Sequence, residues 1–110
     1  MRAQMSAAYR LIADFRRGAI TPGSEITKEQ RRLIELLASD LDVPTKGVPL
    51  EDLLLKVAKV DSLWNKRTVH LIDSFYVLRG QGKQDQAERE RATFLQRCPS
   101  VWYCGMVSSL

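Results

Sequence analysis

The sequence is poor in the residues that most metal and redox sites use. It contains one histidine, His70, and two cysteines, Cys98 and Cys104, with Pro99 between them. A zinc site draws on closely spaced pairs of histidines and cysteines, and one histidine far from both cysteines does not supply them. In a reducing compartment we expect the two cysteines to be free thiols. The sequence therefore predicts neither a metal nor a cofactor.

Catalytic motifs are also missing. The run Gly80-Gln81-Gly82 is too short for a phosphate-binding loop and lacks the Lys-Ser/Thr ending of that motif. The carboxylates occur where helix caps and solvated helix faces would place them, and no two share an apolar stretch, as an acid and base pair requires. His70 could activate a cysteine only if folding brought them together, and a histidine on a helix flank is the simpler interpretation. We therefore expect a protein that is not an enzyme.

Long apolar runs are absent too. No segment approaches the roughly 18 consecutive apolar residues of a transmembrane helix. The stretch at residues 1–17 carries too many arginines for the apolar core of a signal peptide. These features predict an intracellular protein that does not contact a membrane.

The overall composition is that of a folded globular chain. Of its 110 residues, 45% are hydrophobic and 27% are charged, close to the averages for soluble domains. This length is typical of one domain. We expect a single helical domain over residues 1–110, with its core in residues 3–97. Residues 98–110 form an apolar C-terminal segment that packs on the bundle or on a partner.

The net charge of +4 is spread thinly along the chain. A surface that follows nucleic-acid phosphates needs basic residues gathered on one face without interleaved carboxylates. The basic residues here form only short clusters: Arg16-Arg17, Arg31-Arg32 and Lys66-Arg67. We interpret these clusters as solvated surface. A small nucleic-acid-binding domain that uses them is the alternative function.

Helical periodicity begins near the N-terminus. Over residues 3–17, apolar side chains recur at i, i+3, i+4 and i+7, and Gly18 follows as a natural stop. The apolar residues in question are Ala8, Leu11, Ile12 and Phe15. This spacing predicts a first amphipathic helix.

A second helix is predicted by its start and stop signals. Thr27 and Gln30 have the spacing of a capping box, so the helix should begin at about Lys28. Pro44 restricts the residue before it, which should end the helix at Val43.

The rest of the chain continues the helical pattern. Pro49 suits the first position of a third helix. Residues 49–79 form either one long helix or two, and we favour a break or kink near Asp61 because Asp and Ser prefer caps to helix interiors. Asp85 and Glu88 suggest another capping box. With a short final helix and no β-alternating run, the sequence predicts an all-α bundle of about five helices.

The apolar helix faces are wider than a five-helix chain of this length can hide. Small domains bury a smaller share of their surface than large ones, so we expect a homodimer. We place its seam on the first and third helices, at Leu11, Phe15, Leu54 and Trp64. The apolar C-terminal segment offers Trp102 and Tyr103 as docking residues for a partner protein.

Four features of the first two helices occur together in one known family. They are Ala8-Tyr9, Phe15-Arg16-Arg17-Gly18, Thr27-Lys28-Glu29, and the run Leu33, Leu37, Leu41 and Val43. Over residues 7–45 this pattern resembles the ENT domain, the EMSY N-terminal family. The connector GAITPGSEI is longer than in that family, and PTKGVPLED stands where the family has a histidine-containing segment.

The ENT resemblance implies a helical, homodimeric domain of nuclear proteins linked to chromatin and transcription. In that family the domain serves association and partner binding, not catalysis. We therefore expect a protein-interaction or dimerisation module, in the nucleus in preference to the cytoplasm. The residues themselves do not identify the partner.

Overall fold

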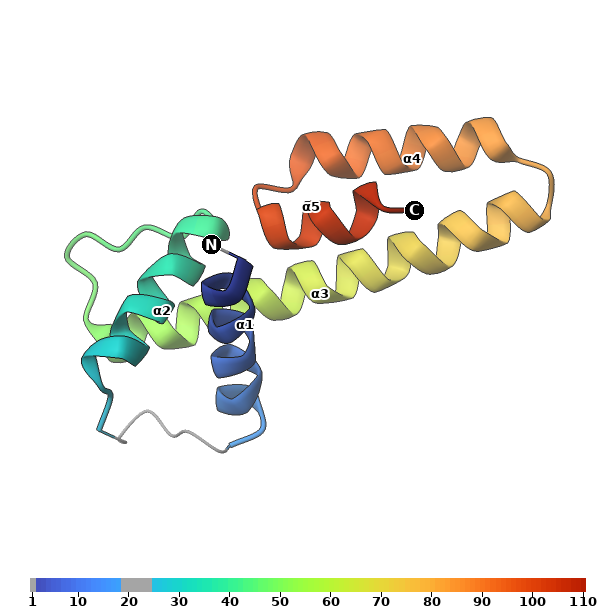
Figure 1. The fold of residues 1–110 in the computed structure, drawn as a ribbon. Helices are drawn as coiled ribbons and strands as arrows, with labels where there is room; N and C mark the ends of the chain where they lie inside the picture. The colour runs from blue at the N-terminus through green and yellow to red at the C-terminus, as the bar shows by residue number, and fades with distance from the viewer. Residues whose placement is uncertain (1, 19–24) are drawn as a thin grey trace. The chain divides into compact units, whose positions relative to one another are not determined.

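The computed structural model describes residues 2–18 and 25–110. These residues form five α-helices and no strand, which confirms the predicted all-α fold (Figure 1). The helices are α1 (Arg2–Arg16), α2 (Lys28–Asp40), α3 (Leu50–Gly80), α4 (Gln84–Arg97) and α5 (Val101–Ser108). None of them, within the described ranges, is both long and apolar enough to cross a membrane.

The chain divides into two compact units, Met1–Asp61 and Ser62–Leu110. The helix α3 runs without interruption through the boundary, so its N-terminal part belongs to the first unit and its C-terminal part to the second. Because one helix is common to both units, this division does not test the prediction of a single domain.

The first unit is built on the apolar faces of α1 and α2. Ile12, Ile34 and Leu37 are fully or almost fully buried there. A polar contact joins the two helices, because the Tyr9 hydroxyl donates to Oδ2 of the buried Asp40 at 2.6 Å. A buried hydroxyl needs such a partner, since an unsatisfied one would carry the full cost of losing water.

The start of α2 confirms the predicted capping box. The Gln30 backbone N–H donates to Thr27 Oγ1 at 3.1 Å, and the Thr27 backbone N–H donates to Gln30 Oε1 at 3.0 Å. Two otherwise unpaired donors of the first turn are satisfied in this way. The helix therefore begins at Lys28, as predicted.

The end of α2 comes earlier than predicted, at Asp40 instead of Val43. Asp42 adopts a left-handed backbone conformation, with φ of 58°. The Val43 N–H then turns back to the Ala38 carbonyl at 2.8 Å, which satisfies an orphan carbonyl of the last turn. Glycine is usual at such a position, although Asp tolerates it better than most residues.

The predicted break near Asp61 is wrong, because α3 continues through Asp61 and Ser62. The side chain of Asp61 is only 1% exposed, and its Oδ2 forms an ion pair with Arg16 Nη2 at 3.3 Å. It therefore binds a partner on α1 instead of capping a helix. A long-range contact of this kind overrides the local preference of Asp for helix ends.

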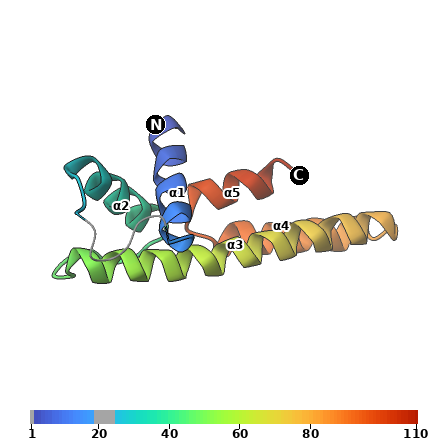
Figure 2. The same ribbon diagram turned by 90° about the horizontal axis from the view of Figure 1, so that it is seen from below.

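In the second unit, α4 returns antiparallel to the C-terminal part of α3, and α5 turns back again (Figure 1, Figure 2). The turn after α3 has Gly82 in a left-handed conformation, with φ of 76°, and the Lys83 N–H donates to the Leu78 carbonyl at 2.8 Å. The predicted capping box of Asp85 and Glu88 is wrong. Helix α4 begins at Gln84, and its N-cap residue, Lys83, makes no side-chain cap bond.

The predicted short final helix is α5. Ser100 caps it, accepting a hydrogen bond from the Tyr103 backbone N–H at 3.1 Å. Tyr103 and Val107 are buried. At the end of the chain, Leu110 packs against a core cluster formed by Phe75, Leu78 and Ala87. No disulfide is formed between Cys98 and Cys104.

Candidate interaction surfaces

Large exposed hydrophobic side chains gather in the second unit. Within the described residues, the first unit exposes Leu55. The second exposes Leu63, Val69, Tyr76, Val77, Val101 and Met106. Scattered apolar residues are normal on a protein surface, but a contiguous group indicates a binding surface.

Four of these side chains lie on one side of α3. Val69 is 51% exposed, and Tyr76 and Val77, two helical turns further on, are each 57% exposed. The opposite side of the same helix carries the buried residues Leu71 and Phe75. We call the exposed side the outer face of α3. Its residues are Leu63, Lys66, Val69, Asp73, Tyr76 and Val77.

The outer face carries one positive and one negative side chain. Lys66 and Asp73 are both exposed and lie seven residues apart, on either side of Val69. At the helical rise, seven residues separate these charges by about 10 Å along the axis. The outer face therefore carries a positive charge on one side of Val69 and a negative charge on the other, with further apolar side chains beyond each charge.

A second surface is a groove between α3 and α4, about 550 Å³ in volume. Its apolar part comes from Trp64, Leu71 and Phe94. The rings of Trp64 and Phe94 meet edge to face, with centroids 5.8 Å apart. Such pairs prefer this geometry and hold each other in place. We call this surface the α3/α4 groove.

Arginines give the α3/α4 groove a positive charge. Arg67, Arg89 and Arg97 line it, with Glu90 as the one carboxylate among the lining residues. The guanidinium of Arg67 stacks on Trp64, 4.8 Å from the ring centroid. Glu90 accepts a hydrogen bond from the Ser74 hydroxyl at 3.2 Å.

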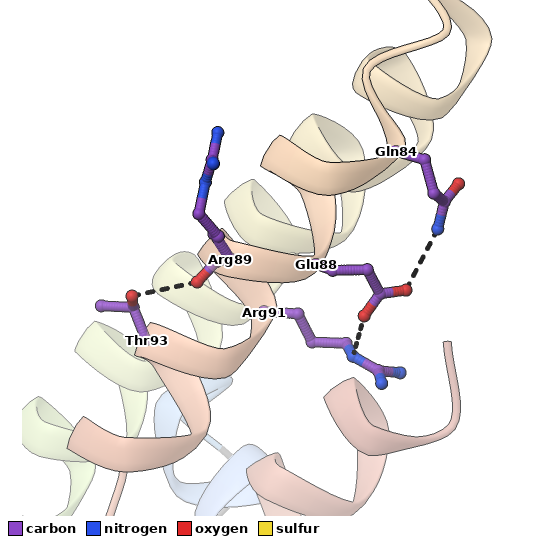
Figure 3. Close-up of polar contacts among 5 residues, drawn as sticks. All are labelled: Gln84, Glu88, Arg89, Arg91 and Thr93. Atoms are coloured by element: carbon purple, nitrogen blue, oxygen red, sulfur yellow. Dashed lines mark hydrogen bonds and ion pairs between the residues drawn. The ribbon is translucent and has the colours of Figure 1, made fainter.

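The other side of α4 has a separate polar network (Figure 3). Glu88 accepts from Gln84 Nε2 at 3.1 Å and pairs with Arg91 Nε at 3.2 Å. On the groove side of α4, Thr93 Oγ1 donates to the Arg89 backbone carbonyl at 3.0 Å. In Figure 3 the Arg89 side chain extends away from Glu88 and Arg91, so that carboxylate does not neutralise it.

Three of the six predicted interface residues are buried, and the other three are half-buried. Leu11 and Leu54 are buried, and with Phe15 they line a space of only about 10 Å³, too small to be a binding cavity. Phe15 is half-buried. The predicted seam is corrected accordingly, because Leu11 and Leu54 belong to the core of the first unit.

The remaining predicted contacts lie in the second unit. Trp64 lines the α3/α4 groove. Tyr103 is buried, which removes it as an exposed docking residue, and Trp102 is half-buried. His70 also lines the groove, whereas neither cysteine does.

Three of the six basic residues proposed for nucleic acid are engaged by carboxylates. Arg16 pairs with Asp61, Arg17 with Asp14, and Arg31 with Glu35. Arg67 stacks on Trp64. Arg32 and Lys66 are exposed, the first on α2 and the second on the outer face of α3.

Sequence reasoning missed Arg89 and Arg97 as members of a site. A signal was present, because the two residues are eight apart on α4 and therefore share one helix face. Their proximity to Trp64 and Arg67, however, depends on how α4 packs against α3.

Comparisons of the chain with protein-family models, with curated proteins and with solved structures gave no match. The resemblance to the ENT family therefore stays a prediction. Residues 19–24 of the connector GAITPGSEI lie outside the described residues.

Proposed function

We propose that this chain is a non-enzymatic helical association module that forms a homodimer through the outer face of α3. The observation that supports this proposal is the self-complementary order of side chains on that face. Lys66, Val69, Asp73 and Tyr76 follow one another at steps of three and four residues, the spacing of a helix–helix seam.

A two-fold axis would pair these side chains with one another. If two copies of α3 cross antiparallel near residues 69–71, Lys66 of each copy lies close to Asp73 of the other. The same symmetry brings the two Val69 side chains together and places Leu63 near Tyr76. Closed two-fold pairs are the commonest protein oligomers, and their interfaces match a surface with itself in this way.

Burial of apolar surface would drive this association, and charge would fix its direction. Val69, Tyr76 and Val77 are each at least half exposed in the single chain. Covering apolar surface contributes about 25 cal/mol per Å² before the costs of association. A parallel pairing would instead set Lys66 against Lys66 and Asp73 against Asp73, which repel each other.

The proposed cellular role rests on the sequence alone. The ENT-like pattern over residues 7–45 suggests a nuclear role linked to chromatin or transcription, and we include it in the proposal. We favour this module over a nucleic-acid-binding domain because ion pairs with carboxylates occupy Arg16, Arg17 and Arg31.

Sedimentation of the full chain tests the dimer. A seam of two short helix segments is small, so the concentrations should span dissociation constants from about 1 µM to about 1 mM. We expect the wild type to pass from monomer to dimer in that range. Val69→Glu should remain monomeric, because each copy would bury a carboxylate beside the other at the axis. Lys56→Glu, an exposed change outside the outer face, is the control and should dimerise.

Monomeric wild type at every concentration would contradict the proposal. So would a Val69→Glu variant that dimerises like the wild type, because the seam would then lie elsewhere.

A further inference from the structure

We propose that the α3/α4 groove binds a short acidic peptide segment of a partner protein, anchored by one bulky apolar side chain. The groove and the outer face of α3 are different surfaces of the second unit. This inference therefore goes beyond self-association and does not depend on it.

The apolar part of the groove suits a bulky anchor. Leu71 is buried beneath it, and the edge-to-face rings of Trp64 and Phe94, both half-buried, supply aromatic surface. A groove of about 550 Å³ can hold a leucine or phenylalanine side chain together with its neighbours in the peptide. Aromatic side chains in such positions often dominate the binding energy of an interface.

The charged part of the groove favours a ligand with negative charge. Arg67, Arg89 and Arg97 surround the apolar part, and Arg89 and Arg97 are exposed. Their two positions on α4, eight residues apart, are separated by about 12 Å along the helix. Carboxylates spaced by about two helical turns, or by about four residues of extended chain, would reach both.

Glu90 limits the ligand further. Its carboxylate lies in the groove and is held there by Ser74. A ligand with a dense row of negative charges would be repelled by this carboxylate. A peptide can instead place a neutral or hydrogen-bond-donating group next to it. The groove is therefore matched to a mixed acidic and apolar peptide.

The arrangement of Trp64 favours a peptide over single-stranded nucleic acid. Sequence-tolerant binding of nucleic acid uses bases stacked on exposed aromatic faces. Here the guanidinium of Arg67 covers one face of the Trp64 ring, and Phe94 meets the ring edge to face. A base would have to displace Arg67 before it could stack on that face.

Fluorescence anisotropy with a labelled probe peptide tests this inference. The probe is a peptide of about 12 residues, the length of an ordinary helix, rich in Asp and Glu with one Phe and two Leu. A matched peptide with Lys in place of each Asp and Glu is the control ligand. We expect the full chain to bind the acidic probe at least about tenfold more tightly than the basic one.

Charge reversal of the groove should remove this preference. Arg89→Glu and Arg97→Glu are changes at exposed positions, and each should weaken binding of the acidic probe by about tenfold, with unchanged helicity by circular dichroism. Lys56→Glu makes the same change of charge outside the groove and should bind like the wild type. Val69→Glu should also bind like the wild type, which separates this test from the test of the dimer.

Three results would overturn the inference. The first is equal binding of the acidic and basic peptides. The second is weakening by Lys56→Glu as large as that by Arg89→Glu, which would show that only net charge matters. The third is a labelled single-stranded oligonucleotide that binds more tightly than the acidic probe and is weakened by the groove variants.

Discussion

The two units of the chain differ in which side chains they bury and which they expose. In the first unit, buried polar groups are paired across the chain, as Tyr9 is with Asp40 and Arg16 with Asp61. In the second unit, large apolar side chains such as Tyr76 and Val77 are exposed, and arginines line an open groove. Side chains that stabilise the chain are therefore conspicuous in the first unit, and side chains available to a partner in the second.

The exposed apolar residues of the second unit differ from the buried ones in what they contribute to stability. An exposed Val69 or Tyr76 adds little to the stability of a monomer, and a polar residue would serve solubility better. These residues lie on one helix face with opposite charges between them, and the proposed dimer would give this arrangement a role that the fold of the single chain does not.

The largest expected effects come from core truncations, which should separate the core from the outer face. Phe75→Ala should lower the free energy of unfolding by about 3–5 kcal/mol and Leu37→Ala by about 2–5 kcal/mol, because both side chains are buried. Val69→Ala, on the outer face, should change it by at most about 0.5 kcal/mol when measured on the monomer. Denaturant titration at low protein concentration provides the comparison. A loss for Val69→Ala as large as that for Leu37→Ala would show that the outer face is part of the core.

A smaller effect is expected from the ion pair of the first unit. Arg16→Ala should cost about 1–3 kcal/mol, because the buried Asp61 loses this cationic partner. The cost stays below that of breaking a fully buried pair because Arg16 is 35% exposed and water screens it.

A double-mutant cycle with Asp61→Asn isolates the contribution of this pair. The two substitutions together should cost less than the sum of their separate costs. Strictly additive costs would mean that the pair adds nothing to stability and that α3 remains continuous for another reason.

The smallest expected effect concerns the cap of α2. Thr27→Ala removes the side-chain acceptor for the Gln30 N–H and should cost about 1 kcal/mol. Thr27→Ser keeps that acceptor and should restore most of the loss. If Ala and Ser at this position gave equal stability in a denaturant titration, the capping box would not contribute.

The sequence predicted those features whose causes are local. The start of α2 depends on Thr27 and Gln30, three residues apart, and the stop after α1 depends on Gly18. Both could be recognised without knowing what packs against them. Five helices and the absence of strands in the described residues follow from the same kind of short-range pattern.

Features with distant causes were missed. Asp61 looked like a helix cap because its partner, Arg16, is far away in the chain. Leu11 and Leu54 looked like an interface because periodicity shows which face of a helix is apolar but not what covers it. The α3/α4 groove could not be predicted, because it depends on how α4 packs on α3. This packing places Arg89 and Arg97 near Trp64.

The central claim is that two copies of α3 pair antiparallel through the outer face, and complementary charge variants test it most directly. Lys66→Asp leaves two carboxylates on this face, and Asp73→Lys leaves two lysines. In a homodimer of either variant, like charges would meet at both ends of the seam and repel. In a mixed pair, both contacts would again join opposite charges.

The measurement is sedimentation of each variant alone and of their equimolar mixture, at a concentration where the wild type is dimeric. We predict that each variant alone is monomeric and that the mixture contains a dimer with one copy of each. If both variants dimerise alone as the wild type does, or if their mixture stays monomeric, the outer face of α3 is not the antiparallel seam proposed here.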